Sequence, residues 1–231
     1  MPQVKGQLVE IWSENGAIAG QIACPPSVLP APGQYLAAYA PEDGAAALTH
    51  PLFLAGTAPD GMRVAPPLPS LWQPGTRLDL RGPLGHGFHL PISARHVALA
   101  ALGDSPARVL SLVDLALAQG CAVTLFCDLS GELPWRNLPD ALEVSPLATL
   151  KDALAWADYL ALDIPIQRLS ERYSLTGLRP GDLLPCKAEV LVMAAMPCAG
   201  LAACGACAVK GRQHWLLACE DGPVLEWERL E

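Results

Sequence analysis

The chain has 231 residues, of which 52% are hydrophobic and 16% charged, and its formal net charge is −8. This composition supplies a large folded core and excludes an intrinsically disordered chain. Basic residues are scattered, which argues against nucleic acid and anionic membranes as partners. No apolar run approaches the roughly 20 residues that span a bilayer, and the start lacks a secretory signal. We therefore expect a cytoplasmic protein, in which clustered cysteines favour metal binding over disulfides.

Residues 1–92 are rich in proline and glycine and carry short alternating runs, namely "GQLVEIW", "AIAGQIA", "GQYLAAYA" and "TRLDLRG". Short strands separated by turn signals predict a small antiparallel β-barrel or sandwich. Asn15 and Gly16 separate the first two runs, and this pair favours the positive φ angles of a tight hairpin turn.

Residues 93–192 have a different pattern, because continuous apolar runs alternate with helical periodicity. "HVALAAL" and "CAVTLFCDL" (121–129) read as buried strands on either side of a helix in "GDSPARVLSLVDLALAQG". Asp104 or Ser105 can cap that helix. Its apolar face would comprise Val109, Leu110, Val113 and Leu117. "LATLKDALAWAD" predicts a second helix, and "YLALDIP" and "AEVLVMA" predict two further strands. Such β-α-β units favour a parallel sheet.

Residues 193–231 contain four cysteines in the pattern C-x5-C-x2-C-x11-C, at Cys198, Cys204, Cys207 and Cys219. Plant-type [2Fe–2S] ferredoxins use C-x4-C-x2-C and a distant fourth cysteine. In such a loop the backbone N–H groups face the sulfides, so the side chains must be small, and "CAGLAACGAC" meets this requirement. Two other interpretations stay open: a zinc site with four cysteine ligands, and an Ala-rich segment with buried free thiols.

The remaining candidate residues suggest no second centre. Cys24, Cys121, Cys127 and Cys186 have no mutual ligand spacing, and we expect them in the core. The five histidines have no metal-ligand spacing, and no Ser-His-Asp or Cys-His nucleophile pattern is present. Trp215 and Trp227 bracket the fourth cysteine, so we expect them to cover a cluster or to contact a partner.

With the cysteines placed, the chain resembles the electron-transfer subunits of the class B dihydroorotate dehydrogenases. The matching motifs are "MPCAGLAACGACAV", "LACEDGPVL", "GPLGHGF" (82–88) and "PGQYL" (32–36). The resemblance implies three parts: a ferredoxin-reductase-like barrel over 1–92, a nucleotide-domain-like α/β unit over 93–192 and a [2Fe–2S] segment over 193–231. It also implies the cluster ligands Cys198, Cys204, Cys207 and Cys219, with one residue more between the first two than is usual in the family.

Two departures concern the nucleotide cofactors that the family binds. Its Arg-Pro-x-Ser/Thr flavin motif corresponds to "HPLF", in which Pro51 and Leu52 are kept as candidate flavin contacts, whereas His50 replaces the arginine and Phe53 the hydroxyl. The later barrel strand and its glycine turn are not visible, so FAD binding stays open. The nicotinamide turn retains only Gly103, followed by Asp104, which argues against NAD.

The resemblance implies an electron-transfer protein with a [2Fe–2S] cluster that serves a flavin-dependent dehydrogenase subunit in a hetero-oligomer. Whether the isolated chain has reductase activity stays open. The alternatives are an active NAD(P)H- and FAD-dependent reductase with diverged sites, and an interaction module stabilised by zinc or free thiols.

Overall fold

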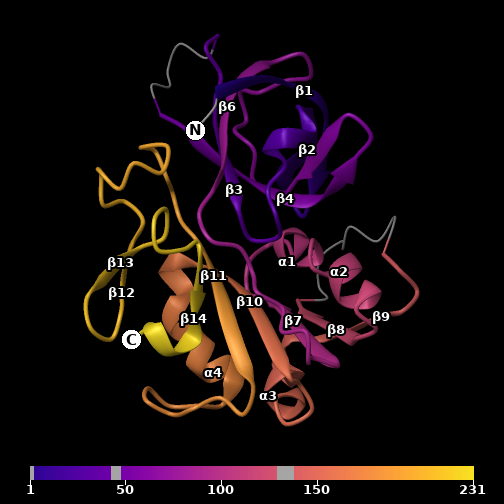
Figure 1. Ribbon diagram of the computed structural model, residues 1–231, viewed down its shortest axis with the longest axis vertical. Helices are drawn as coiled ribbons and strands as arrows, with labels where there is room; N and C mark the ends of the chain where they lie inside the picture. The colour runs from indigo at the N-terminus through magenta and orange to yellow at the C-terminus, as the bar shows by residue number, and fades with distance from the viewer. Residues whose placement is uncertain (1–2, 43–47, 129–137) are drawn as a thin grey trace.

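The protein folds into a β-barrel joined to an α/β unit, as seen in a computed structural model that describes residues 3–42, 48–128 and 138–231 (Figure 1). The barrel is closed by six strands in the order β1-β2-β5-β4-β3-β6. Their bounds are β1 Gln3–Glu14, β2 Ala17–Ala23, β3 Tyr35–Tyr39, β4 His50–Ala58, β5 Gly61–Val64 and β6 Arg77–Leu84. A 3-10 turn, η1, covers Pro26–Val28. The predicted antiparallel barrel is thus confirmed.

The turn between β1 and β2 has the predicted geometry. Asn15 and Gly16 have φ angles of 50° and 79°, and Glu14 pairs with Ala17 across the hairpin. Both central residues therefore adopt the left-handed region that a tight two-residue turn requires.

The later barrel strand that is not visible in the sequence is present in the structure. Strand β4 continues to Ala58, and β5 pairs with both β2 and β4. Gly61 opens β5 so close to β2 that a Cβ atom there would overlap the Ile22 carbonyl oxygen. Because only glycine fits this approach, the strand begins at a residue that reads as a turn signal in the sequence.

The α/β unit is built on a six-stranded sheet in the order β14-β11-β10-β7-β8-β9. The strands are β7 His96–Ala101, β8 Ala122–Cys127, β9 Leu142–Pro146, β10 Tyr159–Pro165, β11 Lys187–Met193 and β14 Val224–Glu226. Five of them run parallel, and β14 pairs antiparallel with β11. The predicted parallel sheet is confirmed, although Leu129, at the end of the expected second strand, lies outside the described residues.

The helices are shorter than the sequence predicts. The first expected helix divides into α1 (Ala107–Leu110) and α2 (Val113–Ala118). Between them the Ser111 hydroxyl donates to the Arg108 carbonyl oxygen at 2.7 Å, which competes with continued helical bonding. The other helical elements are α3 Leu150–Ala153 and α4 Arg172–Thr176, with 3-10 turns η3 Leu147–Thr149, η4 Ile166–Glu171 and η5 Trp227–Arg229. None of the helices in the described ranges has the length and apolar character needed to cross a membrane.

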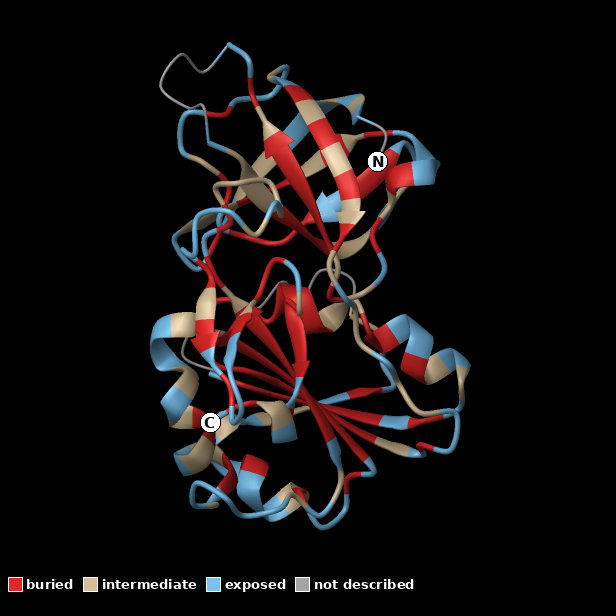
Figure 2. Ribbon diagram, turned by 60° about the vertical axis from the view of Figure 1, so that its left-hand side comes forward, coloured by how far each residue is buried: buried red, intermediate tan, exposed pale blue. Residues whose placement is uncertain are grey.

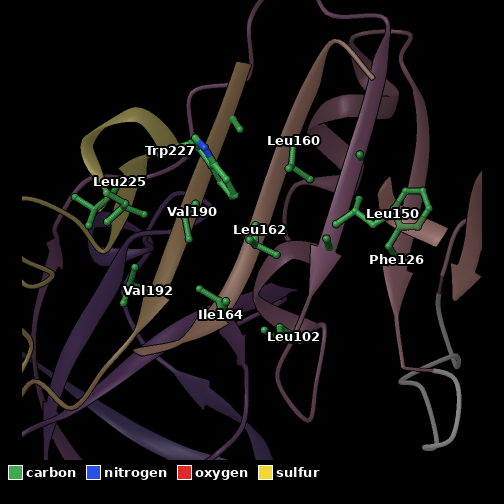
Figure 3. Packing of buried hydrophobic residues seen from close by; sticks show 14 of the residues in the cluster. Leu102, Phe126, Leu150, Leu160, Leu162, Ile164, Val190, Val192, Leu225 and Trp227 are labelled. Carbon is green, nitrogen blue, oxygen red and sulfur yellow. The ribbon is translucent and has the colours of Figure 1, made fainter. Parts of the chain in front are cut away.

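Each face of the sheet buries its own apolar core, because successive strand residues point to opposite faces. Val97, Leu99 and Val123 pack with α1 and α2 on one face. The other face carries Leu160, Leu162 and Val190, and residues from the C-terminal end, among them Leu225 and Trp227, pack over it (Figure 3). Apart from the edge strand β9, the strands of the sheet are buried along most of their length, as Figure 2 shows. The C-terminal segment is therefore part of the α/β core.

Candidate metal centre

The three cysteines that lie close together in the sequence occupy a tightly wound loop after β11, here called the cysteine loop (residues 198–207). Ala199, Gly200, Ala202 and Gly205 have φ angles of 55°, 73°, 55° and 68°. A residue other than glycine costs about 1–2 kcal/mol in the left-handed region. Two alanines there therefore indicate that contacts with the surrounding structure hold the loop in this conformation. Left-handed residues within such a loop can turn backbone N–H groups toward one side.

The fourth cysteine reaches the loop through a small hairpin. Strand β12 (Ala208–Lys210) pairs with β13 (Trp215–Leu217), and the N–H group of Ala218 donates to the Cys207 carbonyl oxygen at 3.1 Å. Cys219 therefore lies beside Cys207, although 11 residues separate them in the sequence. Both side chains are buried, whereas Cys198 is half-buried and Cys204 is exposed.

The four thiols interact as two pairs. Cys204 affects the pKa of Cys198, and Cys207 affects the pKa of Cys219. Within the described residues, no three His, Cys, Asp or Glu side chains converge into a site for a single metal ion. Two neighbouring thiol pairs are the arrangement that a centre with two irons requires, since each iron takes two thiolates.

Backbone N–H groups of the loop point at these sulfur atoms. Burial raises the pKa of Cys198, but the N–H groups of Ala203, Leu201 and Cys204 and the Cys204 thiol outweigh it, and the pKa falls to about 6. A thiolate at Cys198 is thus stabilised by hydrogen bonds to its charged form.

Cys219 lies deeper, and its pKa changes in the opposite direction. Burial and then the bond to Cys207 raise the pKa of Cys219 to about 12, although the N–H group of Ala202 lowers it. A buried thiolate at this position needs a compensating cation, and a coordinated metal supplies one. Small side chains, inward N–H donors and four thiols in two pairs fit an iron–sulfur cluster.

The barrel supports the cysteine loop directly. The Tyr35 hydroxyl, on β3, lies 3.4 Å from the Cys219 carbonyl oxygen and would lie 2.6 Å from a Cβ atom at Gly200. Arg81 of β6 donates to the Ala199 carbonyl oxygen at 3.2 Å. The loop therefore keeps its shape only while it remains docked on the barrel.

Thr49, just before β4, ties the same loop to the barrel. Its hydroxyl donates to the Met196 carbonyl oxygen and accepts from the N–H group of Ala199, both at 3.0 Å. The sequence did not single out Thr49 or Arg81, because neither stands near the cysteines in the chain. The only signal for Thr49 was its place before the "HPLF" stretch.

Two family-like motifs from distant parts of the chain contact each other. The N–H group of His86, in "GPLGHGF", donates to the Gly222 carbonyl oxygen at 2.6 Å, and the N–H group of Val224 donates to the His86 carbonyl oxygen at 3.4 Å. A Cβ atom at Gly85 would lie 2.5 Å from the Gly222 carbonyl oxygen and from Pro223 Cδ. The barrel motif thus packs against the segment that carries Cys219 and is hydrogen-bonded to it.

The candidate flavin residues lie on opposite sides of β4. Pro51 and Phe53 line a cavity of about 500 Å³ between the barrel and the α/β unit, whereas Leu52 is buried inside the barrel. His50 also lines the cavity, and its Nε2 lies 2.8 Å from the Pro67 carbonyl oxygen. Burial lowers the pKa of His50, so its ring is neutral near pH 7.

The crevice where a nicotinamide dinucleotide would approach lies at the carboxyl end of β7, where the strand order reverses. A hollow of about 220 Å³ there is lined in part by Gly103, Asp104, Asp128 and Arg168. Arg168 already donates to the Leu102 carbonyl oxygen at 2.6 Å and pairs with Glu171 at 2.8 Å.

The first N–H group of α1 likewise has a hydrogen-bond partner within the protein. The N–H group of Ala107 donates to Ser105 Oγ at 3.1 Å, and that hydroxyl donates to the buried Glu14. Of the two candidate caps, Ser105 therefore bonds the helix start. A phosphate at this crevice would meet the carboxylates of Asp104 and Asp128, and the only arginine of the described lining, Arg168, is already paired.

Arg108 and Asp163 form a buried ion pair that the sequence did not reveal. Arg108 Nε lies 2.9 Å from Asp163 Oδ2, and Arg108 Nη1 donates to the Pro66 carbonyl oxygen at 2.7 Å. Arg108 belongs to α1, Asp163 to β10 and Pro66 to the barrel segment after β5. No local pattern links residues 55 positions apart, so only the fold brings them together.

The two tryptophans on either side of Cys219 in the sequence lie in different environments. Trp215 is 66% exposed. Trp227 is 2% exposed and lies in the sheet core (Figure 3). Its ring packs edge-on against that of Tyr173. The expectation that Trp227 covers the cluster or contacts a partner is therefore wrong, because the chain turns back into β14 after Pro223. Cys24, Cys121 and Cys127 are buried in the core and Cys186 is half-buried at its edge.

Comparisons with known proteins agree with this geometry. Residues 194–231 match the iron–sulfur cluster binding domain of dihydroorotate dehydrogenase B. The chain is 28% identical over 185 residues to the dihydroorotate dehydrogenase B (NAD(+)) electron transfer subunit of Desulforamulus reducens. That alignment covers 68% of this chain, and the chain spans 66% of the relative's length.

Solved structures are similar in fold. An NADH-dependent reduced ferredoxin-NADP oxidoreductase superposes with a TM-score of 0.71 at 21% identity, covering 98% of this chain and 89% of that one. The ferredoxin-NADP+ reductase of Plasmodium falciparum gives a TM-score of 0.57 at 10% identity, covering 76% and 89%. The fold is ferredoxin-reductase-like. The chain is thus similar to the dihydroorotate dehydrogenase B electron transfer subunits, and its residues 194–231 match the model of their iron–sulfur cluster binding domain.

Proposed function

We propose that this chain is an electron-transfer protein that holds a [2Fe–2S] cluster on Cys198, Cys204, Cys207 and Cys219. One observation carries the proposal. The four thiols lie in two pairs, and backbone N–H groups of the cysteine loop interact with Cys198 and Cys219. Such a cluster, when bound, accepts and donates one electron at a time. The chain's own residues supply the thiolates, donate hydrogen bonds to their sulfur atoms and exclude water from Cys207 and Cys219.

The partner we propose is the flavin-dependent catalytic subunit of a dehydrogenase of the dihydroorotate type. Support comes from the relative of Desulforamulus reducens, whose name describes an electron transfer subunit. The exposed side of the cysteine loop, with Cys204 and the 61% exposed Leu201, leaves the centre near a surface that a partner can approach. Free thiols require a reducing compartment, so we place the protein in the cytoplasm.

Anaerobic purification followed by visible absorption and by iron and sulfide analysis tests the cluster. We expect about two irons and two sulfides per chain. Cys207→Ser removes one thiolate and is expected to abolish the visible spectrum. Cys186→Ser is the matched control, because that thiol lies at the core edge and its burial raises its pKa to about 11. A colourless protein with one zinc, or an unchanged spectrum in Cys207→Ser, would contradict the ligand assignment.

Electron relay is tested separately from cluster assembly. The protein reduced with dithionite is mixed anaerobically with an oxidised catalytic subunit of a dihydroorotate dehydrogenase B. We expect the cluster absorption to return as the partner's flavin is reduced. A cluster that remains reduced in the presence of this subunit argues against the proposed partner.

A further inference from the structure

The cavity between the barrel and the α/β unit lies directly beside the cysteine loop. Its volume is about 500 Å³, within the range of small-molecule sites. The barrel contributes His50, Pro51 and Phe53 to the lining, and the chain between β11 and the loop contributes Ala194–Pro197. Because Pro197 directly precedes Cys198, the cavity adjoins the start of the cysteine loop.

The lining is mainly apolar. Most of its described side chains are aliphatic, aromatic or proline, among them Leu48, Phe53, Trp72 and Met193. An apolar cavity with few polar groups favours a ligand whose buried surface is also apolar. Flat faces are offered by the proline-rich segment 66–69 and by the rings of Phe53 and Trp72.

The two side chains of the described lining that can carry positive charge are both engaged. His50 bonds through Nε2 to the Pro67 carbonyl oxygen at 2.8 Å, and its ring packs edge-on against Trp72 with centroids 6.0 Å apart. Arg108, 4% exposed, is paired with Asp163 and bonded to the Pro66 carbonyl oxygen at 2.7 Å. The carbonyl oxygens of the adjacent residues Pro66 and Pro67 are thus hydrogen-bonded to these two side chains.

These contacts conflict with the charge of a flavin dinucleotide. The pyrophosphate of FAD is doubly negative, and a buried anion needs cations or several free donors. His50 is neutral near pH 7, and the charge of Arg108 is already balanced by Asp163. A phosphate inside the cavity would therefore lose its hydration without gaining a counter-charge.

We propose that this cavity binds an uncharged planar ring compound and does not bind a flavin dinucleotide. The ring would lie against the apolar lining from Pro51, Phe53 and Met193. This binding does not depend on the cluster, so it can fail while the proposed function holds, and the reverse. Only the ring is recognised, since neither His50 nor Arg108, the two basic side chains of the described lining, is free to balance the charge of a phosphate.

The test is a fluorescence titration of the full-length protein with lumiflavin, FMN and FAD, which share one ring and differ in charge. We expect saturable binding of lumiflavin and at least tenfold weaker binding of FMN and FAD. A site for the dinucleotide would give the opposite order. Tighter binding of FAD than of lumiflavin, or no saturation by lumiflavin, would overturn the proposal.

Two variants locate the binding and its charge preference. Ala195→Trp, at an exposed lining position, is expected to weaken lumiflavin binding at least tenfold, whereas Ile92→Trp, 87% exposed and outside the lining, leaves it unchanged. His50→Arg adds a permanent cation and is expected to raise the ratio of FMN affinity to lumiflavin affinity at least fivefold. Equal effects of the two tryptophans, or no rise in this ratio, would contradict the proposal.

Discussion

At the residue scale, Gly200 and Gly205 have the same backbone requirement and different surroundings. Both lie in the left-handed region, at φ 73° and 68°. A Cβ atom at Gly200 would lie 2.6 Å from the Tyr35 hydroxyl oxygen, whereas none of the described atoms lies within 4 Å of one at Gly205. The first glycine is needed for a close approach to the barrel, and the second only for its φ angle.

We therefore predict that Gly200→Ala destabilises the protein more than Gly205→Ala. Each substitution costs about 1 kcal/mol for the φ angle, and Gly200→Ala adds the overlap with Tyr35. Thermal unfolding of the two variants measures the difference, and the iron released to a chelator reports the loop. Tyr35→Phe in the Gly200→Ala background removes the overlapping oxygen and is expected to restore part of the loss. Equal effects of the two alanines would contradict this role of Tyr35.

The buried Arg108–Asp163 pair supports a second prediction at this scale. Arg108→Met leaves Asp163, 0% exposed, without its cation, and breaking a buried pair in this way costs about 3–5 kcal/mol. Lys210→Met, which breaks an exposed pair with Glu231, should cost about 1 kcal/mol or less. Urea unfolding measures both. Replacing both partners, as Arg108→Met with Asp163→Leu, should recover most of the loss, and a double variant as unstable as Arg108→Met would contradict the argument.

At the scale of elements, one carboxylate joins the starting ends of two parallel strands. Asp158, directly before β10, accepts the N–H groups of Arg95 and His96 at 2.9 Å each, at the start of β7. These two backbone donors, Arg95 first, hold the pKa of Asp158 below its usual range. The charged form is thus favoured in the folded state, and its contribution to stability depends on pH.

We predict that Asp158→Asn destabilises the protein near pH 7 and that the difference shrinks in acid. Because the folded pKa is depressed, the carboxylate contributes fully above the ordinary aspartate value of about 4, and its contribution disappears as the pH falls through the folded pKa. Urea midpoints at pH 7, 4 and 3 measure the trend, with Asp140→Asn at an exposed position as control. A constant difference at all three pH values would contradict it.

At the scale of the whole molecule, the segment that carries the cysteines also completes the α/β sheet. Leu225 and Trp227 pack in the sheet core, and β14 covers the edge of β11 (Figure 3). The backbone hydrogen bonds of His86 with Gly222 and Val224 also connect this segment to the barrel motif. The cluster segment is consequently joined to both halves of the molecule.

We predict that a chain ending at residue 193 does not fold cooperatively. It would lose an edge strand and expose the core face that Leu225 and Trp227 cover, and loss of one large aromatic side chain alone costs about 3–5 kcal/mol. Far-ultraviolet circular dichroism and urea unfolding measure the result. The control is the full chain with all four candidate ligand cysteines replaced by serine, which should keep its sheet. A cooperative transition in the truncated chain would show that the segment is separable.

Local patterns determined much of this protein in advance. The alternating runs predicted four of the six barrel strands, namely β1, β2, β3 and β6. The Asn15-Gly16 pair predicted the hairpin, and the continuous runs predicted the parallel sheet, since each depends on neighbours in the chain. The spacing of the cysteines indicated the candidate ligands for the same reason. The sequence did not predict strand β5, because its first residue, Gly61, indicates a turn as long as the neighbouring strand is unknown.

Only the tertiary structure decided how the centre is held and what lies beside it. Tyr35, Thr49 and Arg81 reach the cysteine loop from the barrel, across more than 100 positions of the chain. Arg108 meets Asp163 and Pro66 by the same route. Such contacts arise where distant elements pack together, and no pattern of neighbouring residues encodes them. The sequence by itself therefore determined which thiols to examine, whereas the packing of barrel against sheet decided their pairing, their support and the mainly apolar cavity beside the cysteine loop.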